Sequence, residues 1–376
     1  MAVGRLVSQD PTRLLRFPGP VAGYPLEPSN EELAAIAGLS TEAIVRYDMN
    51  TLGDGPLPAV REAWAQWDPA AVVEYGDLGY RRLRAAIGDH AGVAPQRVIP
   101  GSGADELIRL VTTAVVGPGD AVIVLTPTFP MFAVEAALTG ASAIAVPRAH
   151  PAQRQATERI RAAAEEGSAR LVWLCSPNNP TGDGTPLPEI AAVADGLEAI
   201  VVVDQVYLEF AIAAGHTDLD ALALADRLDN VLVLRSMAKS HGLAGARIGY
   251  LIVPDALAER FDALRLPLSV GLPTEQLAVA ALADAEEANE RHAAIMRERS
   301  HLADALKRLG CEVLDGVGNF VTFRPPDAAE LADALLRRGL ILRAYDAGVM
   351  AGWLRATARG AEENATLIAA LDDLLG

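Results

Sequence analysis

Cysteine, positive charge and long apolar runs are all scarce in this sequence. The two cysteines, Cys175 and Cys311, are too few for a disulfide framework, and neither belongs to a CxxC or Cys/His metal-binding pattern. Isolated cysteines of this kind are typical of buried thiols in a reducing compartment. The opening residues, MAVGRLVSQDPTRLLRF, lack the compact apolar stretch of a signal peptide. A cytoplasmic protein without a metal site is therefore expected.

The shortage of positive charge limits the partners that the chain can have. The 32 basic residues are outnumbered by 49 acidic ones, which gives a formal net charge of -17 at pH 7. Such a surface repels nucleic acid and anionic lipid, and no cluster of arginine and lysine provides a local exception. No apolar run reaches membrane-spanning length. Neither a nucleic acid nor a membrane is expected as a partner.

Lysine is the scarcest charged residue, because all the basic residues except Lys239 and Lys307 are arginine. Arginine stays protonated in proteins and cannot form an imine, whereas a lysine amine with a lowered pKa can. Lys307 lies in the amphipathic stretch HLADALKRLG, which is typical of a surface helix. Lys239 is either a similar chance survivor or a functional amine, and its neighbours favour the second interpretation.

The length and the apolar pattern predict a two-domain α/β protein. A chain of 376 residues exceeds what one compact core usually holds. Strand-length apolar runs alternate with segments of helical period, which is typical of a mainly parallel sheet covered by helices. The expected strands are 121–125, 142–146, 171–175, 200–203, 231–234 and 249–253, and the expected helices between them are 104–115, 156–166, 189–197 and 219–228. The expected division is an N-terminal arm and part of the small domain in 1–49, a large domain in 50–255 and a small C-terminal domain in 256–376.

In open α/β sheets the ligand binds at the carboxyl ends of the strands. After RVIP comes a glycine turn, residues 101–106 (GSGADE), which leads into a helix whose free N–H groups suit a phosphate. Such turns are common, so this motif alone is a weak signal. A dinucleotide fingerprint is less well supported, because Glu106 stands where GxGxxG needs its third glycine.

Three further strand ends carry polar or aromatic side chains. Phe129 could stack on a flat heteroaromatic ring or simply pack in the core. Residues 176–182 (SPNNPTG) fix a turn that exposes an asparagine amide, or serve as a turn alone. Asp204 follows four apolar residues, with Tyr207 three positions on. A carboxylate there needs a partner, which could be a protonated pyridine nitrogen or the N–H groups of the next segment.

The motif around Lys239 is the most specific one in the chain. The strand 231–234 ends in RSMAK, followed by SHGLAGARIGY. Ser236 and Arg247 can offer a hydroxyl and a guanidinium to a phosphate, with the Lys239 amine between them in sequence.

With these motifs the chain resembles the fold-type I pyridoxal-phosphate (PLP) aminotransferases, and within them the histidinol-phosphate aminotransferase-like branch. The resemblance runs from Asp48-Met49-Asn50 to Leu354-Arg355-Ala356-Thr357, with the motifs in the family's order. It implies the PLP-dependent transferase fold type I, in which a mainly parallel central sheet is covered by helices and joined to a smaller α+β domain. It also implies pyridoxal 5'-phosphate as the cofactor.

The resemblance assigns catalytic and cofactor-binding roles by position. Lys239 would carry PLP as a Schiff base, Asp204 would pair with the pyridine nitrogen, and Tyr207 would donate to the ring oxygen. The other implied cofactor contacts are Asn179 at the ring oxygen, Phe129 against the ring, and Ala104, Asp105, Ser236 and Arg247 at the phosphate. Tyr75 looks like the tyrosine that reaches the phosphate of the neighbouring subunit, which implies a homodimer.

The substrate residues are less well determined. Arg355 resembles the arginine that binds the substrate carboxylate, with a surface arginine as the alternative. Arg343 aligns with a position that binds the substrate phosphate in histidinol-phosphate aminotransferases, but enzymes of other specificity also have arginine there. Asn50, expected near the substrate, opens NTLGDGPLP where the family reads NENPYGPSP. The added Asp54 would repel a phosphate, so another amino acid or amine is a candidate donor beside histidinol phosphate.

Three functions fit this sequence. The leading one is an aminotransferase that moves an amino group from an amino acid or amine to a 2-oxo acid. The second is another PLP reaction on the same scaffold, such as a phosphothreonine-type decarboxylase, cyclase or oxidase, because the cofactor residues do not choose the bond that breaks. The third is a PLP-binding regulator without turnover, which neither the length nor the acidic charge favours.

Overall fold

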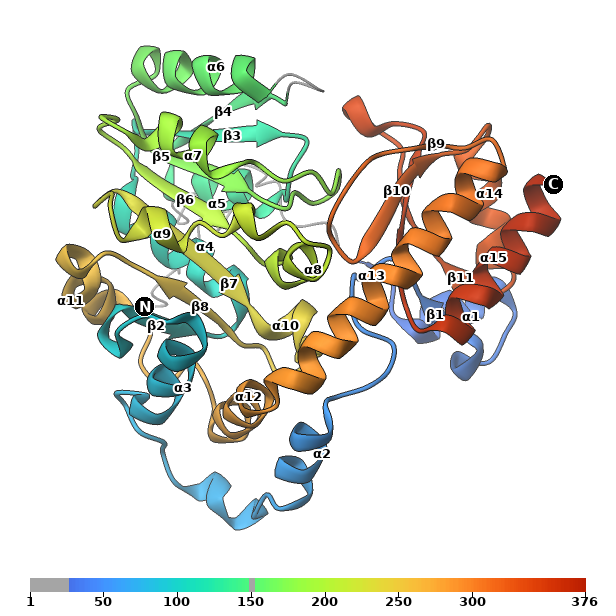
Figure 1. Cartoon of the computed structure of the whole chain (residues 1–376), viewed down its shortest axis with the longest axis horizontal. Coiled ribbons are helices and arrows are strands. Elements are labelled where there is room, and N and C mark those ends of the chain that lie inside the picture. The colour runs from blue at the N-terminus through green and yellow to red at the C-terminus, as the bar shows by residue number, and fades with distance from the viewer. Residues whose placement is uncertain (1–26, 149–152) are drawn as a thin grey trace, which may run out of the picture.

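A computed structural model describes residues 27–148 and 153–376 and has a seven-stranded sheet at its centre (Figure 1). The strands are β2 (Val98–Gly101), β3 (Ala121–Thr126), β4 (Ser142–Pro147), β5 (Ala169–Cys175), β6 (Ile200–Asp204), β7 (Val231–Ser236) and β8 (Gly249–Ile252). They follow the order β2-β8-β7-β6-β5-β3-β4. The pairs from β7 to β4 are parallel, and β8 is antiparallel to both of its neighbours. The expected mainly parallel α/β fold is confirmed.

Helices cover both faces of the sheet because its central strands are apolar on both sides. Along β5, Trp173 belongs to one core and Val172 to the other. The core around Trp173 is covered by α4 (Gly103–Val115), α5 (Met131–Thr139) and α11 (Asp255–Leu264). The core around Val172 is covered by α2 (Pro58–Ala65), α3 (Arg81–Ala91), α6 (Gln153–Glu166), α7 (Leu187–Ala194) and α12 (Leu272–Ala283).

The helix expected over residues 219–228 is much shorter in the structure, so the predicted length is wrong. Only α9 (Leu222–Ala225) is α-helical, and η5 (Thr217–Leu219) is a separate 3-10 turn. Gln205 donates to the carbonyl of Leu219 at 2.6 Å and accepts from the N–H of Ala221 at 3.2 Å. Asp220 accepts from the N–H of Leu222 at 3.0 Å. These contacts satisfy backbone groups that a continuous helix would pair internally, so the segment forms two short turns.

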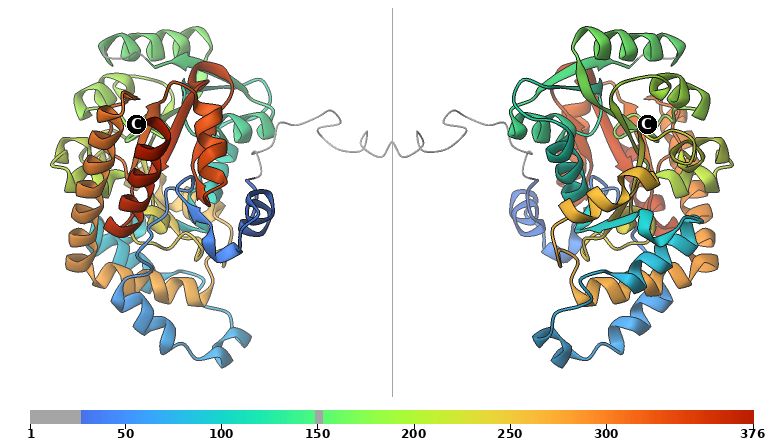
Figure 2. Two further views of the ribbon diagram at one scale, coloured as in Figure 1. Left: turned by 90° about the vertical axis from the view of Figure 1, so that its right-hand side faces the viewer. Right: turned by 90° about the vertical axis from the view of Figure 1, so that its left-hand side faces the viewer.

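The second domain is built on a four-stranded antiparallel sheet of order β12-β13-β10-β9. Its strands are β9 (Glu312–Val313), β10 (Phe320–Arg324), β12 (Arg343–Tyr345) and β13 (Trp353–Thr357), and its helices are α13 (Ala285–Arg308), α14 (Ala328–Leu336) and α15 (Ala361–Leu375). The long helix α13 runs from the large domain into the small one (Figure 1). The side views of Figure 2 show α13 and α15 side by side.

Residues before 50 pack with this second domain. Strand β1 (Val45–Arg46) pairs in parallel with β11 (Leu340–Ile341), and α1 (Asn30–Ala37) places Leu33 and Ala34 against Ile341. The remaining short segments are α8 (Leu208–Ala213), α10 (Met237–Ser240), η2 (Thr41–Ala43), η3 (Pro69–Val73), η4 (Pro95–Arg97) and η6 (Gly348–Met350). The part of the expected arm up to residue 26 lies outside the described residues.

The division at residue 256 stays a prediction. Phe261 of α11 and Ala281 of α12 are buried in the two cores of the large sheet. This packing favours a boundary nearer the start of α13 and leaves β9 to β13 in the small domain. In the described ranges, no helix is both long and apolar enough to cross a membrane.

Candidate active site

The expected cofactor residues meet at one edge of the large sheet. Strands β6 and β7 are parallel neighbours and end in Asp204 and Ser236. Ser236 caps the short helix α10, where its hydroxyl accepts from the N–H of Ala238 at 3.2 Å, and Lys239 follows within that turn. Because parallel strands bring their carboxyl ends to one edge, residues far apart in sequence face the same space.

Lys239 has the properties of a reactive amine. Its Nζ donates to the carbonyl oxygen of Met49 at 2.7 Å. Burial, together with the nearby guanidinium groups of Arg355 and Arg247, lowers the pKa of Lys239 to about 8, although the carboxylates of Asp105 and Asp48 act in the opposite direction. A larger fraction of the amine is therefore neutral near pH 7 than for an exposed lysine.

Asp204 is a buried carboxyl group without a cationic partner among the described residues. Its side chain is 4% exposed, and burial raises its pKa to about 7. One of its oxygens accepts from the N–H of Val206 at 3.1 Å, so the capping alternative describes part of its environment. Within the described ranges no arginine or lysine forms an ion pair with it. A positively charged ring nitrogen would supply the charge that this site lacks.

Tyr207 is held by the small-domain side of the site. Its hydroxyl accepts a hydrogen bond from Asn50 Nδ2 at 2.9 Å, and burial raises the pKa of Tyr207. Asn50 adopts a left-handed backbone conformation, with φ of 53°, and its N–H donates to Thr357 Oγ1 at 2.9 Å. Because Tyr207 already accepts from Asn50, its own proton is directed to another acceptor, as a donor to a ring oxygen requires.

The start of α4 forms the base of an anion site. Ser102, before the helix, makes no side-chain cap, so the N–H groups of Ala104 and Asp105 are available to a ligand. Arg247 Nη2 donates to Asp105 Oδ2 at 2.9 Å and lies above Gly103. A Cβ atom on Gly103 would come within 2.5 Å of that nitrogen. The glycine therefore keeps the guanidinium close to the helix end, where both can bind a phosphate.

Gly249 has a role that the sequence reasoning did not assign. It begins β8, and a Cβ atom there would lie 2.9 Å from the carbonyl carbon of Gly103 and 3.0 Å from the nitrogen of Ala104. Both are backbone atoms, so the close approach of β8 to the start of α4 depends on this glycine. Its position two residues after Arg247 was the sequence signal that could have predicted this role.

Arg355 is buried within the site, so the alternative of a surface arginine is wrong. It is 6% exposed and donates to Asn179 Oδ1 and to the carbonyl oxygen of Asp48. Its guanidinium lies 5.4 Å from the centre of the Phe320 ring. Both hydrogen-bond acceptors are neutral, so the positive charge of Arg355 is available to a substrate carboxylate.

Three expected residues, Phe129, Arg343 and Tyr75, are partly or largely exposed. Phe129 is partly buried and packs edge-to-face on Phe132, with ring centres 5.9 Å apart. Tyr75 is 88% exposed, so it does not pack into the buried site of its own chain. Arg343 forms an ion pair with Glu27, a residue that the sequence reasoning missed. No local motif marks Glu27, because its partner lies more than 300 positions away.

The fold and these residues define a class, the two-domain α/β enzymes that use pyridoxal phosphate. The model of the family Aminotransferase class I and II matches residues 44–371, and this chain belongs to that family. It is a PLP-dependent aminotransferase.

Its relatives include histidinol-phosphate aminotransferases of Nitratidesulfovibrio vulgaris and Roseiflexus castenholzii. These are 35% and 34% identical to it, over 92% of this chain and over 92% and 93% of their own lengths. The crystal structure of histidinol-phosphate aminotransferase from Sinorhizobium meliloti in complex with pyridoxal-5'-phosphate is similar, with a TM-score of 0.84 and 28% identity. That likeness covers 93% of this chain and 95% of the other.

Proposed function

We propose that Lys239 binds PLP and moves a proton during amino transfer, while Arg355 holds the carboxylate of the substrate. One observation carries this proposal: the two side chains donate to the carbonyl oxygens of consecutive residues, Met49 and Asp48. The amine and the guanidinium therefore converge on one short segment. An amino acid needs both groups, one for its α-carbon and one for its carboxylate.

Each remaining residue has a role that follows from its environment. When bound, PLP withdraws electrons from the substrate's α-carbon. Asp204 balances the charge of a protonated ring nitrogen, because no arginine or lysine in the described part of the chain forms an ion pair with it. Tyr207 and Asn179 hold the ring oxygen, and Phe129 covers the ring. The phosphate is held by the N–H groups of Ala104 and Asp105 with Ser236 and Arg247. Lys239, with its lowered pKa, would accept the proton from the α-carbon and pass it to the cofactor carbon that bears the transferred nitrogen.

Two observations bear on the identity of the amino donor. The names of the relatives suggest histidinol phosphate, which carries a phosphate ester where an amino acid carries its carboxylate, with a 2-oxo acid as acceptor. Against that donor stands Asp54, in the segment NTLGDGPLP beside Asn50. Asp54 lies against Gly360, where a Cβ atom would come within 2.5 Å of Asp54 Oδ1. This exposed carboxylate adds negative charge beside Gly360, three positions after Thr357 in the sequence.

A cytoplasmic homodimer completes the proposal. Tyr75 is flanked by other exposed apolar side chains, with Val73 80% exposed, Val72 68% and Leu78 59%. An apolar cluster of this kind is typical of a surface that another chain covers. A second copy of the chain would cover it, and Tyr75 would then reach the phosphate site of that copy.

An absorption spectrum of the purified, PLP-loaded protein tests the function. The wild type should have a Schiff-base band that an amino donor converts to the pyridoxamine form, and Lys239→Ala should lack the band. Lys307→Ala, the matched lysine variant, should behave as the wild type. If PLP does not bind the wild type, the proposal is wrong. A band that donors alter without forming pyridoxamine phosphate would favour a decarboxylase, cyclase or oxidase.

A further inference from the structure

Two arginines stand side by side on the small sheet at the substrate side. Arg343 of β12 and Arg355 of β13 are directly opposite each other in an antiparallel pair. Residues opposite each other in such a pair project from the same face, with their Cβ atoms about 5 Å apart. Two positive charges in that arrangement repel each other, so an anion that pairs with one of them stabilises the folded protein.

The two guanidinium groups have different partners. Within residues 27–148 and 153–376, Arg355 donates to two neutral oxygens, those of Asn179 and Asp48. Arg343 instead forms an ion pair with the carboxylate of Glu27, and the side chains of this pair are 26% and 23% exposed. The charge of Arg355 is therefore available to a ligand, whereas the charge of Arg343 is already balanced within the chain.

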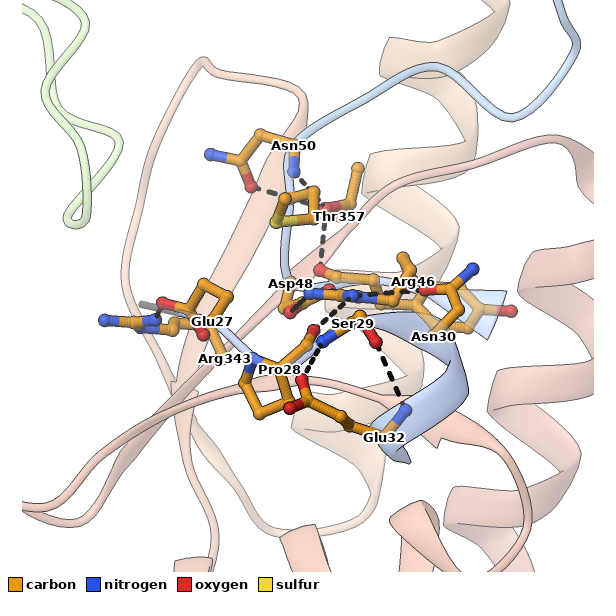
Figure 3. A network of polar contacts seen from close by, with 12 residues as sticks. Glu27, Pro28, Ser29, Asn30, Glu32, Arg46, Asp48, Asn50, Arg343 and Thr357 are labelled. Atoms are coloured by element: carbon orange, nitrogen blue, oxygen red, sulfur yellow. Dashed lines mark hydrogen bonds and ion pairs between the residues drawn. The ribbon is translucent and has the colours of Figure 1, made fainter. Parts of the chain in front are cut away.

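Glu27 is held in place by the residues that follow it (Figure 3). Arg46 Nη1 donates to the carbonyl oxygen of Pro28 at 3.0 Å and to Asn30 Oδ1 at 3.2 Å. The same guanidinium binds both carboxylate oxygens of Asp48, at 2.8 and 2.7 Å. Asp48 in turn accepts from Arg355 through its carbonyl oxygen. One polar network therefore joins the segment that carries Glu27 to the arginine that we assign to the substrate carboxylate.

The helix after this segment provides a second anchor. Ser29 and Glu32 form a capping box at the start of α1, with hydrogen bonds of 2.8 and 3.2 Å. Leu33 packs with Ile341, two positions before Arg343. The segment directly after Glu27 is thus anchored next to the strand that leads to Arg343, so a ligand that replaces Glu27 must break an interaction that the fold already aligns.

We propose that Glu27 makes this enzyme select substrates with one carboxylate over substrates that carry a second anionic group, a carboxylate or a phosphate, at the far end of the side chain. A single carboxylate binds Arg355. A second anionic group on the substrate would meet Arg343, where it must displace Glu27 and then lie beside that displaced carboxylate. The selection has two causes: the Glu27 carboxylate repels the second anionic group, and Arg343 is already paired and does not attract it. It rests on the proposed role of Arg355.

Binding of unreactive ligands to the PLP-loaded protein tests this selection without turnover. Calorimetry would measure the dissociation constants of valerate, glutarate and 4-phosphonobutyrate for the wild type, Glu27→Gln and Arg343→Gln. Glu27→Gln should bind glutarate and 4-phosphonobutyrate about tenfold or more tightly, because Arg343 gains an unpaired charge, and should bind valerate within about twofold of the wild type. Glu31→Gln removes an equal charge from an exposed position on α1 and should change none of the three constants.

The double variant Glu27→Gln/Arg343→Gln separates this effect from a general loss of negative charge. Its binding of glutarate and 4-phosphonobutyrate should fall back to the wild-type level or below, because the gain in Glu27→Gln depends on Arg343. Equal changes for all three ligands, or a gain that persists in the double variant, would overturn the selection. Failure of valerate to bind the wild type while Lys239 still carries PLP would instead refute the role of Arg355.

Discussion

Asp204, Ser236 and Lys239 lie at or just after the ends of neighbouring parallel strands. Arg343 and Arg355 instead lie opposite each other on a small antiparallel sheet, and each has a partner before residue 50. The two halves of the site are built differently. On the cofactor side, one turn supplies several groups, and the sheet brings successive turns together. On the substrate side, each arginine depends on a residue that lies far away in the sequence. Local sequence motifs therefore identify the cofactor side, but they do not identify the substrate side.

Asp204→Asn should have the largest effect and should act on the cofactor side alone. Asparagine keeps the shape and the contact with Val206 but cannot balance a positive ring nitrogen. We expect kcat to fall about 10²–10⁴-fold, since the charge is needed while the α-carbon loses its proton. Steady-state kinetics with a donor found in the spectral screen would measure this.

The exposed Asp195→Asn provides the control for Asp204→Asn, and its kcat should equal that of the wild type. A similar decrease in both variants, or an unchanged kcat in Asp204→Asn, would mean that Asp204 does not pair with the ring nitrogen.

The same contrast explains what the sequence could and could not predict. The strands ending at Asp204 and Ser236 are continuous apolar runs, and polar residues directly after them stand out. The length of the helix around Leu222–Ala225 was overestimated, because side chains of Gln205 and Asp220 bind backbone groups that a longer helix would pair internally. Pairing of Arg343 with Glu27 was not predictable, because neither residue belongs to a motif that specifies the other.

Arg355→Lys should have a smaller effect and should change the substrate side alone. Lysine keeps the charge but cannot donate to Asn179 and Asp48 while also binding both oxygens of a carboxylate. We expect kcat/KM to fall about 10–100-fold, with the Schiff-base spectrum unchanged. Arg308→Lys, at an exposed position, should keep both properties. Loss of the PLP band in Arg355→Lys would show that the two sides are not separable in this way.

Gly249→Ala should have the smallest effect, again on the cofactor side. The new Cβ atom would meet backbone atoms of Gly103 and Ala104 and move the start of α4 away from the phosphate. We expect the affinity for PLP to fall roughly tenfold, as measured by titrating the cofactor-free protein, because a helix-end anion site depends on the position of its N–H groups. Gly117→Ala, where a Cβ atom has no neighbour within 4 Å, should bind PLP as the wild type does. Equal affinities in the two variants would contradict the assigned phosphate site.

The scarcity of lysine makes the central assignment directly measurable. Borohydride reduction of the PLP-loaded protein would fix the cofactor to the amine that carries it, and mass spectrometry of the digested protein would locate it. With only two lysines in the chain, the modified peptide identifies that amine without ambiguity. We expect the pyridoxyl group on the peptide that contains Lys239. A pyridoxyl group on Lys307 alone, or no modified lysine in protein that has bound PLP, would contradict the account.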